Sequence, residues 1–395
     1  MSDFPELKLK AREDRRLRAG HVWVYSNEID TAATPLKGME TGAVARISGA
    51  DGKFLGYAGV SPHSLIAARI LSRDPAHVPG ASLVVHRLKV ALSLRERLYA
   101  EPHYRLCFSE GDLLPGLIVE RFGDYAVLQA GTATMEAMKG GIVDAVVKVL
   151  KPAGVLWRND SGAREAEGLE RYVEVAHGEV PEQVPVVENG LQLTAPVHHG
   201  QKTGWFFDQR DNRARFARYR PRSVLDVFSY TGGWGLSAAA RGATATLVDA
   251  SAQALEVGAA DAARLGLAVS TLQGPAFDVM KGLAEEGRRF EAVVVDPPAF
   301  VKRRKDLKAG LTAYQRANQL ALRLLERDGI LVSCSCSYHV SLEDLLTVVQ
   351  RAARQVDRFV QVLEIGGQSA CHPVHPAIPE TRYLKAVFCR VLPAG

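Results

Sequence analysis

Short apolar runs alternate with helical segments through the C-terminal half of the chain, and this alternation constrains the fold more than any other feature. The apolar runs predict strands at 223–230, 244–251, 269–273, within 290–300, within 328–340, and near 358–365 and 383–392. Helical spacing predicts helices between them at 231–243, 252–267, 276–287, 312–329 and 341–356. This alternation is typical of a parallel, doubly wound α/β sheet.

Polar residues follow several of these predicted strands. They are Asp226 to Gly233, Asp249, Asp296 to Pro298, and Cys334 to Ser337. Ligands bind at the carboxyl ends of the strands in such a sheet. We therefore expect the four groups to converge on one edge.

The N-terminal half predicts two further regions. Residues 1–76 contain strand-like pieces and glycine turns, which indicate a small β-rich domain. Residues 77–185 predict a central α+β domain with a helix at 83–99, a hairpin within 109–130 and a second helix at 135–152. A stretch with two prolines, 179–190, marks the boundary with a third domain, 186–395.

The composition is that of a soluble globular protein, with 47% hydrophobic and 24% charged residues among 395. No apolar stretch is long enough to cross a bilayer, and the charged N-terminus lacks the core of a secretory signal. We therefore expect a cytoplasmic protein without a membrane partner. The odd number of cysteines, five, excludes a complete disulfide framework and predicts free thiols.

Two segments concentrate positive charge. Residues 210–222 contain six arginines and one aspartate, and residues 302–308 contain five cations and one aspartate. Either segment is a solvated surface or a site for nucleic acid, and the net charge of +5 does not decide between them.

The glycine turn after the first predicted strand of the C-terminal half suits a nucleotide or a tightly packed turn. The segment 233–238, GWGLSA, matches a dinucleotide fingerprint, but it begins about two residues later than a pyrophosphate site requires. S-adenosylmethionine is the alternative cofactor, with an acidic residue followed by turn residues at alternate positions: Asp226, Phe228, Tyr230 and Gly232. Asp249 suits the ribose hydroxyls of either cofactor.

The segment DPPAF, 296–300, favours S-adenosylmethionine. Neither proline can donate a hydrogen bond to a sheet, and Pro297 restricts Asp296 to extended geometry. A carboxylate held rigidly in this way can contact the amine or ring nitrogen of a flat base, which a hydride-transferring dehydrogenase does not need.

The chain resembles the bacterial large-subunit ribosomal RNA cytosine-C5 methyltransferases, which are class I enzymes that use S-adenosylmethionine. The resemblance spans nearly the whole chain and is carried by the segments RRLRAGHVWVYSNEI, SEGDLLPGLIVERFGDYAVLQ, GQKTGWFFDQRDNR, VLDVFSYTGGWGL, DPPAF, SCSCS and YLKAVFCRVL. It implies an N-terminal PUA-like domain, a central domain and a C-terminal Rossmann-like methyltransferase sheet.

The resemblance also implies roles for individual residues. The segment 200–210 is similar to the family's cofactor-capping motif, and the cofactor residues that it implies are Lys202, Asp208, Asp226, Phe228, Ser229, Tyr230, Gly232, Asp249, Phe277 and Asp278. The substrate is implied to be 23S ribosomal RNA or a precursor of the large ribosomal subunit, bound through Pro297, Pro298, Phe300, Lys302, Arg303 and Arg213. A homodimer is left open.

Two positions depart from the family pattern. Pro275 stands where relatives carry an acidic residue that holds the adenine amine, and Asp278 is the nearest substitute. Cys371 precedes His372 and Pro373 where relatives tend to have aspartate, so the contacts of His372 are expected to differ.

For the chemistry, alignment on the family's Ser/Thr-Cys-Ser motif implies that Cys336 is the nucleophile. A thiolate that adds to C6 of cytosine turns C5 into an enamine-like carbon, and Asp296 is suited to hydrogen-bond N3 meanwhile. Cys334 is expected to be a packing residue, although the two-residue period of a strand would point both thiols the same way. A metal site is disfavoured because no paired Cys-x-x-Cys or His-x-x-x-His unit is present.

Two other functions remain open. The same fold could methylate a purine nitrogen without a thiol, since Asp-Pro-Pro resembles an amino-methylating motif. Alternatively, the chain is a non-catalytic RNA-binding assembly factor, which Pro275 in the adenine region would favour.

Overall fold

The computed structural model describes residues 4–394, which divide into two compact units. The first unit comprises the chain up to Val186 together with Pro196–Trp205 and Ala370–Thr381, and the second comprises Val187–Ala195, Phe206–Ser369 and the chain from Arg382. Domain boundaries at residues 76 and 185 therefore stay a prediction. None of the described helices is long and apolar enough to span a membrane.

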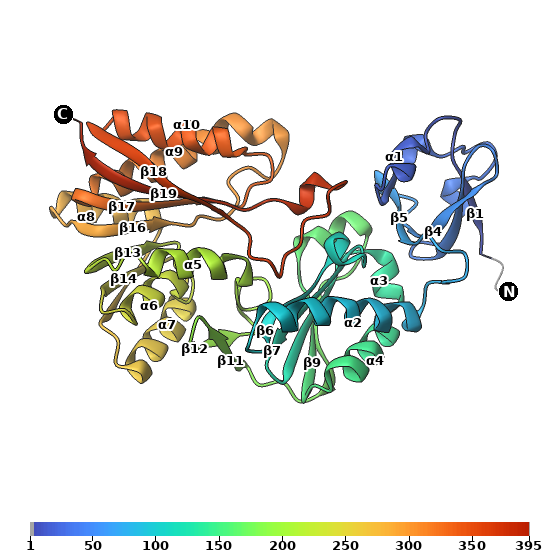
Figure 1. Cartoon of the computed structure of the whole chain (residues 1–395), viewed down its shortest axis with the longest axis horizontal. Helices are drawn as coiled ribbons and strands as arrows, with labels where there is room; N and C mark the ends of the chain where they lie inside the picture. The colour runs from blue at the N-terminus through green and yellow to red at the C-terminus, as the bar shows by residue number, and fades with distance from the viewer. Residues whose placement is uncertain (1–3, 395) are drawn as a thin grey trace. The chain divides into compact units, whose positions relative to one another are not determined.

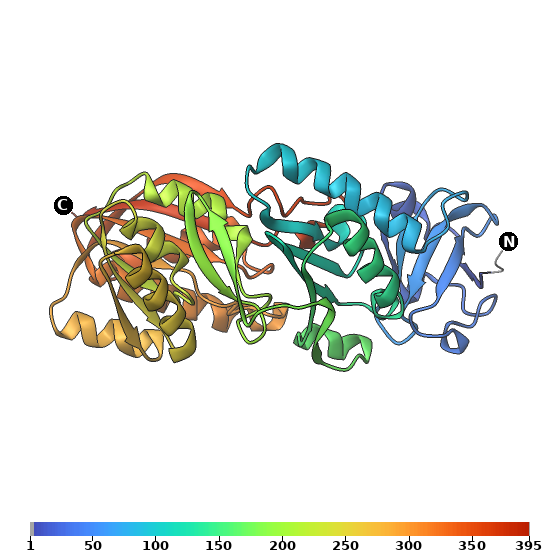
Figure 2. The same ribbon diagram turned by 90° about the horizontal axis from the view of Figure 1, so that it is seen from below.

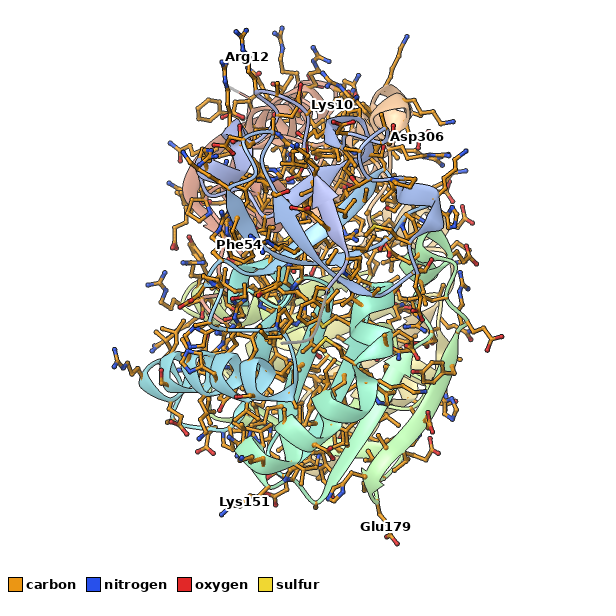
Figure 3. The ribbon with its side chains drawn as sticks, turned by 90° about the vertical axis from the view of Figure 1, so that its right-hand side faces the viewer. Lys10, Arg12, Phe54, Lys151, Glu179 and Asp306 are labelled. Atoms are coloured by element: carbon orange, nitrogen blue, oxygen red, sulfur yellow. The ribbon has the colours of Figure 1, made fainter. Side chains whose placement is uncertain are left out.

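The first unit contains two five-stranded sheets. The N-terminal sheet has the order β1 (Glu6–Lys8), β3 (Val44–Ser48), β4 (Phe54–Val60), β5 (Ile66–Ser72) and β2 (Trp23–Tyr25), with one short helix, α1 (Arg15–Arg18). Buried apolar residues such as Val24, Ile47 and Ala68 form its own core. Lys10 and Arg12 project outward beside this sheet (Figure 3).

The second sheet of this unit is predominantly antiparallel. Its order is β10 (Tyr172–Gly178), β9 (Gly154–Asn159), β8 (Tyr125–Ala130), β7 (Leu117–Phe122) and β6 (His103–Phe108), with β8 and β9 parallel. The predicted hairpin is confirmed as β7 and β8. The two predicted helices are confirmed as α2 (Ala81–Leu98) and α4 (Lys139–Leu150), which lie side by side (Figure 2), with α3 (Ala133–Ala137) just before α4.

A seven-stranded sheet organises the second unit. Its order is β15 (Val269–Gln273), β14 (Thr244–Asp249), β13 (Ser223–Val227), β16 (Phe290–Val295), β17 (Leu325–Ser335), β19 (Lys385–Pro393) and β18 (Arg358–Gly367). A hairpin of β11 (Gln183–Glu188) and β12 (Leu191–Pro196) precedes it. The first five strands in this order are parallel, as predicted, and β18 runs in the same direction. Only β19 among these strands is reversed, because it returns between β17 and β18 and is antiparallel to both.

Helices cover both faces of this sheet (Figure 1). On one side lie α8 (Ala276–Glu285), α9 (Leu307–Arg323) and α10 (Leu342–Arg354), and on the other lie α5 (Arg210–Ala217), α6 (Gly233–Ala239) and α7 (Ala252–Leu265). Consecutive residues of β16 serve opposite faces, since Val293 packs in the α8–α10 core and Val294 in the α5–α6 core. Burial on both faces explains the continuous apolar runs.

Local signals set several helix ends correctly. The Ser251 side chain accepts a hydrogen bond from the Ala254 amide at the start of α7, and Gly266 ends that helix with φ of 65°. Ser341 and Asp344 form a capping box at the start of α10.

The prediction of a helix at 312–329 was wrong at both ends. Helix α9 starts five residues earlier and stops at Arg323, because Leu325 pairs with Phe290 as the first residue of β17. Arg358 donates to the carbonyl of Leu325 at 2.7 Å and so supports this early start of the strand. The helical period of the leucines alone could not reveal this pairing.

Candidate active site

The candidate site lies where the connections of the sheet change direction. Strand β13 has β14 on one side and β16 on the other, and both neighbours run parallel to it. Their carboxyl ends bring together Asp226 in β13, Asp249 at the end of β14 and Asp296 just after β16. Such a switch point is the usual ligand crevice of a doubly wound sheet.

The turn after β13 has an unusual backbone. Phe228, Tyr230 and Gly232 have φ values of 63°, 52° and 85°, so every second residue is left-handed. For an aromatic residue this conformation costs of order 1–3 kcal/mol and is kept where function or packing demands it. At Gly232 a Cβ atom would also meet Leu247 Cδ1 at 2.5 Å, so only glycine fits. The left-handed conformation at Phe228 and Tyr230 is therefore maintained at an energetic cost, which is typical of a functional turn.

Asp249 fixes this turn from the neighbouring strand. Its Oδ2 accepts the Tyr230 amide at 2.8 Å and its Oδ1 accepts the Ser251 amide at 2.9 Å. Each carboxylate oxygen has a second lone pair, so the group can still accept from ribose hydroxyls. Ser229 lies in the same turn, buried, with its amide bonded to the carbonyl of Val248.

Asp226 is fully buried beneath the turn. Its Oδ2 accepts the Gly235 amide at 2.9 Å, and within residues 4–394 no hydrogen bond reaches Oδ1. Burial, and then the charge on Asp296, raise the pKa of Asp226 to about 7. A positively charged ligand next to this buried carboxyl group would stabilise its ionised form.

Asp296 is oriented by two side chains that sequence reasoning missed. Gln209 Nε2 and Trp234 Nε1 each donate to its Oδ2 at 3.0 Å. Removal from water, with the charge on Asp208 adding to it, raises the pKa of Asp296 to about 6. Both partners lie in segments quoted above as family motifs, but only the fold reveals that they meet this carboxylate.

The two cysteines of the SCSCS segment have different surroundings. Cys334 is fully buried among the residues that pack under α5 and α6, and burial raises the pKa of its thiol well above the ordinary value. Cys336 follows the last residue of β17, Ser335, and is partly exposed. Its Sγ donates to the carbonyl of Pro297 at 3.8 Å, which brings the thiol next to the DPPAF segment.

A hydroxyl network supports the turn that carries Cys336. Tyr314 Oη accepts from Ser335 Oγ at 3.0 Å and lies 2.9 Å from Ser337 Oγ. Ser337 Oγ also accepts the Val301 amide at 3.1 Å. Both neighbours of Cys336 are thus fixed from α9 and from the segment after DPPAF.

Three phenylalanines that the sequence assigned separately form one aromatic cluster. The ring centroids of Phe228, Phe277 and Phe300 lie 6.2–6.3 Å apart. The Arg316 guanidinium lies 5.0 Å from the Phe277 ring. Because Phe228 belongs to the glycine turn and Phe300 to DPPAF, the cluster links the predicted cofactor and substrate segments.

The remaining predicted cofactor residues lie in three separate segments of the chain. Asp208 is buried in the second unit and accepts from Tyr383 Oη at 2.5 Å. Asp278 is exposed in the first turn of α8, one helix position from Phe277, and Pro275 is the N-cap of that helix. Lys202 belongs to the first unit, and its role stays a prediction.

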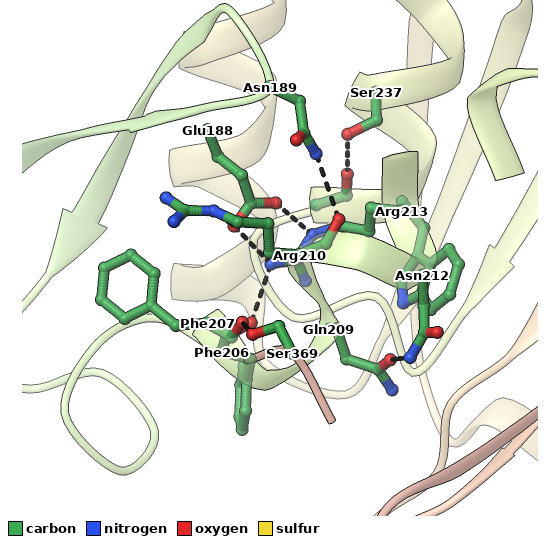
Figure 4. Close-up of polar contacts among 12 residues, drawn as sticks. Glu188, Asn189, Phe206, Phe207, Gln209, Arg210, Asn212, Arg213, Ser237 and Ser369 are labelled. Carbon is green, nitrogen blue, oxygen red and sulfur yellow. Dashed lines mark hydrogen bonds and ion pairs between the residues drawn. The ribbon is translucent and has the colours of Figure 1, made fainter. Parts of the chain in front are cut away.

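The predicted RNA contact of Arg213 is contradicted. Arg213 is buried and donates to both oxygens of Glu188, at 2.5 and 2.8 Å (Figure 4). Arg218 and Arg222 pair with Glu364 and Glu291. The residue types alone suggested a basic surface. In the fold, however, several arginines of the 210–222 cluster form ion pairs with glutamates that are distant in the sequence.

The 302–308 segment differs from that cluster. Its five cations are exposed, and Arg303 pairs with Asp306 at 3.2 Å. Lys302 and Arg303 are exposed, so their contact with RNA stays a prediction. Pro298 is exposed and Pro297 is buried.

We expect Glu188→Ala to destabilise the fold by about 3–5 kcal/mol, because it leaves the Arg213 charge buried without its partner. The Arg210 guanidinium, 3.8 Å from the same carboxylate, would lose its counter-ion too. Urea unfolding measures the effect. Asp328→Ala, which breaks the exposed pair with Arg390, is the control and should cost below about 1 kcal/mol. Equal losses in the two variants would contradict this account.

Comparison with known proteins identifies the family. Residues 168–390 match the model of the S-adenosylmethionine-dependent methyltransferases, and residues 7–73 match a PUA-like domain. The chain is 34% identical over 388 residues to ribosomal RNA large subunit methyltransferase I of Aliivibrio fischeri, covering 96% of this chain and 97% of that protein. This chain belongs to the S-adenosylmethionine-dependent methyltransferases, in the family of ribosomal RNA large subunit methyltransferase I.

Other relatives agree with this assignment. The methyltransferase is 35% identical over 402 residues to ribosomal RNA large subunit methyltransferase I of Shewanella frigidimarina, covering 98% and 99% of the two chains. Its fold is similar to a Streptococcus mutans sam-dependent methyltransferase, with a TM-score of 0.81 at 18% identity over 98% and 100% of the chains. A methyltransferase solved in complex with SAH has a TM-score of 0.82, also at 18% identity and the same coverage.

The strand-end carboxylates fit the charge of S-adenosylmethionine. The cofactor is cationic at its sulfonium, and the methyltransferase offers a buried carboxylate, Asp226, whose Oδ1 has no hydrogen bond within the described chain. Asp249 and the left-handed turn at 228–232 lie beside it. Among residues 4–394 no three or more His, Cys, Asp or Glu side chains are grouped so that they could hold a metal ion.

We expect cofactor binding to release up to one proton near pH 6.5. Asp226 is then largely protonated because its pKa is about 7, and a nearby positive charge favours the carboxylate and lowers that pKa. Calorimetry in buffers of different ionisation enthalpy measures the release, with Asp226→Asn as the control that abolishes it. Heats that are independent of the buffer in the unmodified protein would contradict the predicted role of Asp226 in binding the cofactor.

Proposed function

We propose that this methyltransferase transfers a methyl group to C5 of a cytosine in large-subunit ribosomal RNA through a covalent bond to Cys336. The observation that carries the proposal is the approach of the partly exposed Cys336 thiol to the carbonyl of Pro297, the residue after Asp296. A nucleophile and an acid–base group are thus held on adjacent strand ends. Methylation of a purine nitrogen would need the second group but not the first.

The names of the relatives support RNA as the substrate, since they are ribosomal RNA large subunit methyltransferases. A thiol cannot reach C6 of a stacked base, so the cytosine must be turned out of the RNA. The exposed cations at 302–308 follow directly after DPPAF and are suited to phosphates. The PUA-like residues 7–73 would add contacts to shape and backbone. Nothing in this proposal requires a homodimer.

In the proposed reaction, Cys336 loses its proton and the thiolate adds to C6, forming a sulfur–carbon bond. The electrons of the C5=C6 bond move toward N3, which takes a proton from Asp296, and C5 becomes the nucleophilic carbon of an enamine. Bound S-adenosylmethionine would supply an electrophilic methyl group, which C5 would take as the S–CH3 bond breaks and the neutral thioether leaves. A base then removes the C5 proton, N3 returns its proton, the C5=C6 bond re-forms and the thiolate of Cys336 leaves.

The position of the methyl group tests the proposal. Under-modified large-subunit RNA is incubated with the methyltransferase and labelled S-adenosylmethionine, then digested to nucleosides. We expect the label in 5-methylcytidine. Label in an N-methylated purine would support the nitrogen chemistry instead, and cofactor binding without any transfer would support the non-catalytic assembly factor.

A further inference from the structure

Lys385 lies beside the proposed nucleophile on a neighbouring strand. It is the first residue of β19, where it pairs with Ser335 of β17 on one side and with Gly367 of β18 on the other. Its Nζ donates to the carbonyl of Ser337 at 2.6 Å and to the carbonyl of Tyr383 at 2.8 Å. Because Ser337 directly follows Cys336, this lysine is attached to the turn that presents the thiol.

Several charged or titratable groups face this lysine and the thiol. Burial lowers the pKa of Lys385 to about 8, while the charges of Cys336 and Asp344 favour the ammonium and that of Arg382 opposes it. Around the thiol lie Tyr314 from α9 and the buried Cys334. Asp296, one residue before the carbonyl that the thiol contacts, adds a negative charge on the DPPAF side. Of these groups, Lys385 is the cation that donates a hydrogen bond to the turn carrying Cys336.

We propose that Lys385 is a positioning residue for Cys336, because its ammonium holds the 336–337 turn and its positive charge favours the thiolate there. An ammonium has three donors, and two carbonyls fix two of them, so the charge is held in one place. A thiolate beside a fixed lysine is a better nucleophile at neutral pH than a free thiol. The role in turnover rests on the proposed function, whereas the effect on the thiol does not.

Alkylation of Cys336 with iodoacetamide tests this effect in the full chain without cofactor or RNA. The thiolate displaces iodide and forms a sulfur–carbon bond, so the rate follows the thiolate fraction. The other four cysteines are buried, and mass spectrometry of the 336 peptide confirms the site. Rates are measured from pH 5.5 to 9.5 for the unmodified protein, Lys385→Gln, Lys385→Met and Lys385→Arg.

We expect Lys385→Gln to move the midpoint of the alkylation profile upward by about one pH unit, with a roughly tenfold slower reaction at pH 7. Lys385→Arg should restore most of the rate, since it keeps the charge. Glutamine can still donate to a carbonyl, so the comparison with Lys385→Met separates the charge from the support of the turn. Arg390→Met, an exposed change of the same charge on the same strand, should leave the profile unchanged.

Identical profiles for the unmodified protein and Lys385→Gln would overturn the proposal, as would a profile in Lys385→Arg no different from that in Lys385→Gln. Thermal unfolding of each variant, and the absence of alkylation at the buried cysteines, show whether a slower rate comes from a disturbed fold. A shifted profile in a protein that makes no 5-methylcytidine would leave this inference standing and reject the proposed function. Turnover to 5-methylcytidine together with alkylation profiles that do not depend on Lys385 would reject this inference and leave the proposed function standing.

Discussion

We expect Cys336→Ala to abolish methyl transfer, with a loss of about 10³-fold or more in kcat, because in the proposed mechanism the thiolate of this residue forms the bond to C6. The proposal assigns the reaction to the thiol at 336, which is partly exposed, lies past the end of β17 and contacts the Pro297 carbonyl. Binding of S-adenosylmethionine should be unchanged in this variant. Single-turnover assays with labelled cofactor and under-modified RNA measure the loss.

Cys334→Ala is the matched control. This thiol is buried two residues earlier and packs in the core under α5 and α6, so its removal leaves a small cavity and costs stability of order 1 kcal/mol. Activity at a temperature well below unfolding should stay within about threefold of the unmodified protein. Full activity in Cys336→Ala, or complete loss in Cys334→Ala without unfolding, would contradict the assignment of the nucleophile.

Asp296→Asn is expected to lower the rate by about 10²- to 10⁴-fold, because the amide cannot give a proton to N3. The change keeps the size of the side chain, and the donors Gln209 and Trp234 can still reach its remaining carbonyl oxygen. The fold and the binding of RNA should therefore be preserved. Rapid-quench measurement of the methyl-transfer step gives the effect.

The pH profile distinguishes proton transfer from a structural effect of this substitution. The reaction needs protonated Asp296 and the thiolate together, so the rate rises with the thiolate fraction and levels off near the Asp296 pKa of about 6. In Asp296→Asn this break should disappear, and the rate should rise until the thiol is fully ionised. The same break in both proteins would show that another group causes it.

The carboxylates of the site were predictable from the sequence because they follow from one pattern. Asp249 and Asp296 each follow an apolar run and Asp226 lies near the end of one, and parallel strands align such ends on one edge. The hydrogen-bond partners that orient these carboxylates were not predictable. Gln209 and Trp234 reach Asp296 from segments 87 and 62 residues away, and this pairing depends on the packing of α5 and α6.

Charge and strand direction were the weaker parts of the prediction. Arg213 looked like a phosphate ligand until its buried partner, Glu188 on β11, was known. The strands β18 and β19 carry ordinary apolar alternation, which does not record that β19 returns antiparallel between β17 and β18. That return is what brings Lys385 to the carbonyl of Ser337.

A covalent trap tests the central claim most directly. In 5-fluorocytosine a fluorine atom replaces the C5 hydrogen, so after methyl transfer no C5 proton is left for a base to remove. The cysteine then cannot leave, and the protein should stay bound to the base through sulfur. We expect an RNA–protein adduct that survives denaturation, requires S-adenosylmethionine and maps to the peptide with Cys336. Methylation of cytosine in ordinary RNA without any adduct on the fluorinated RNA, or an adduct at another residue, would contradict the account.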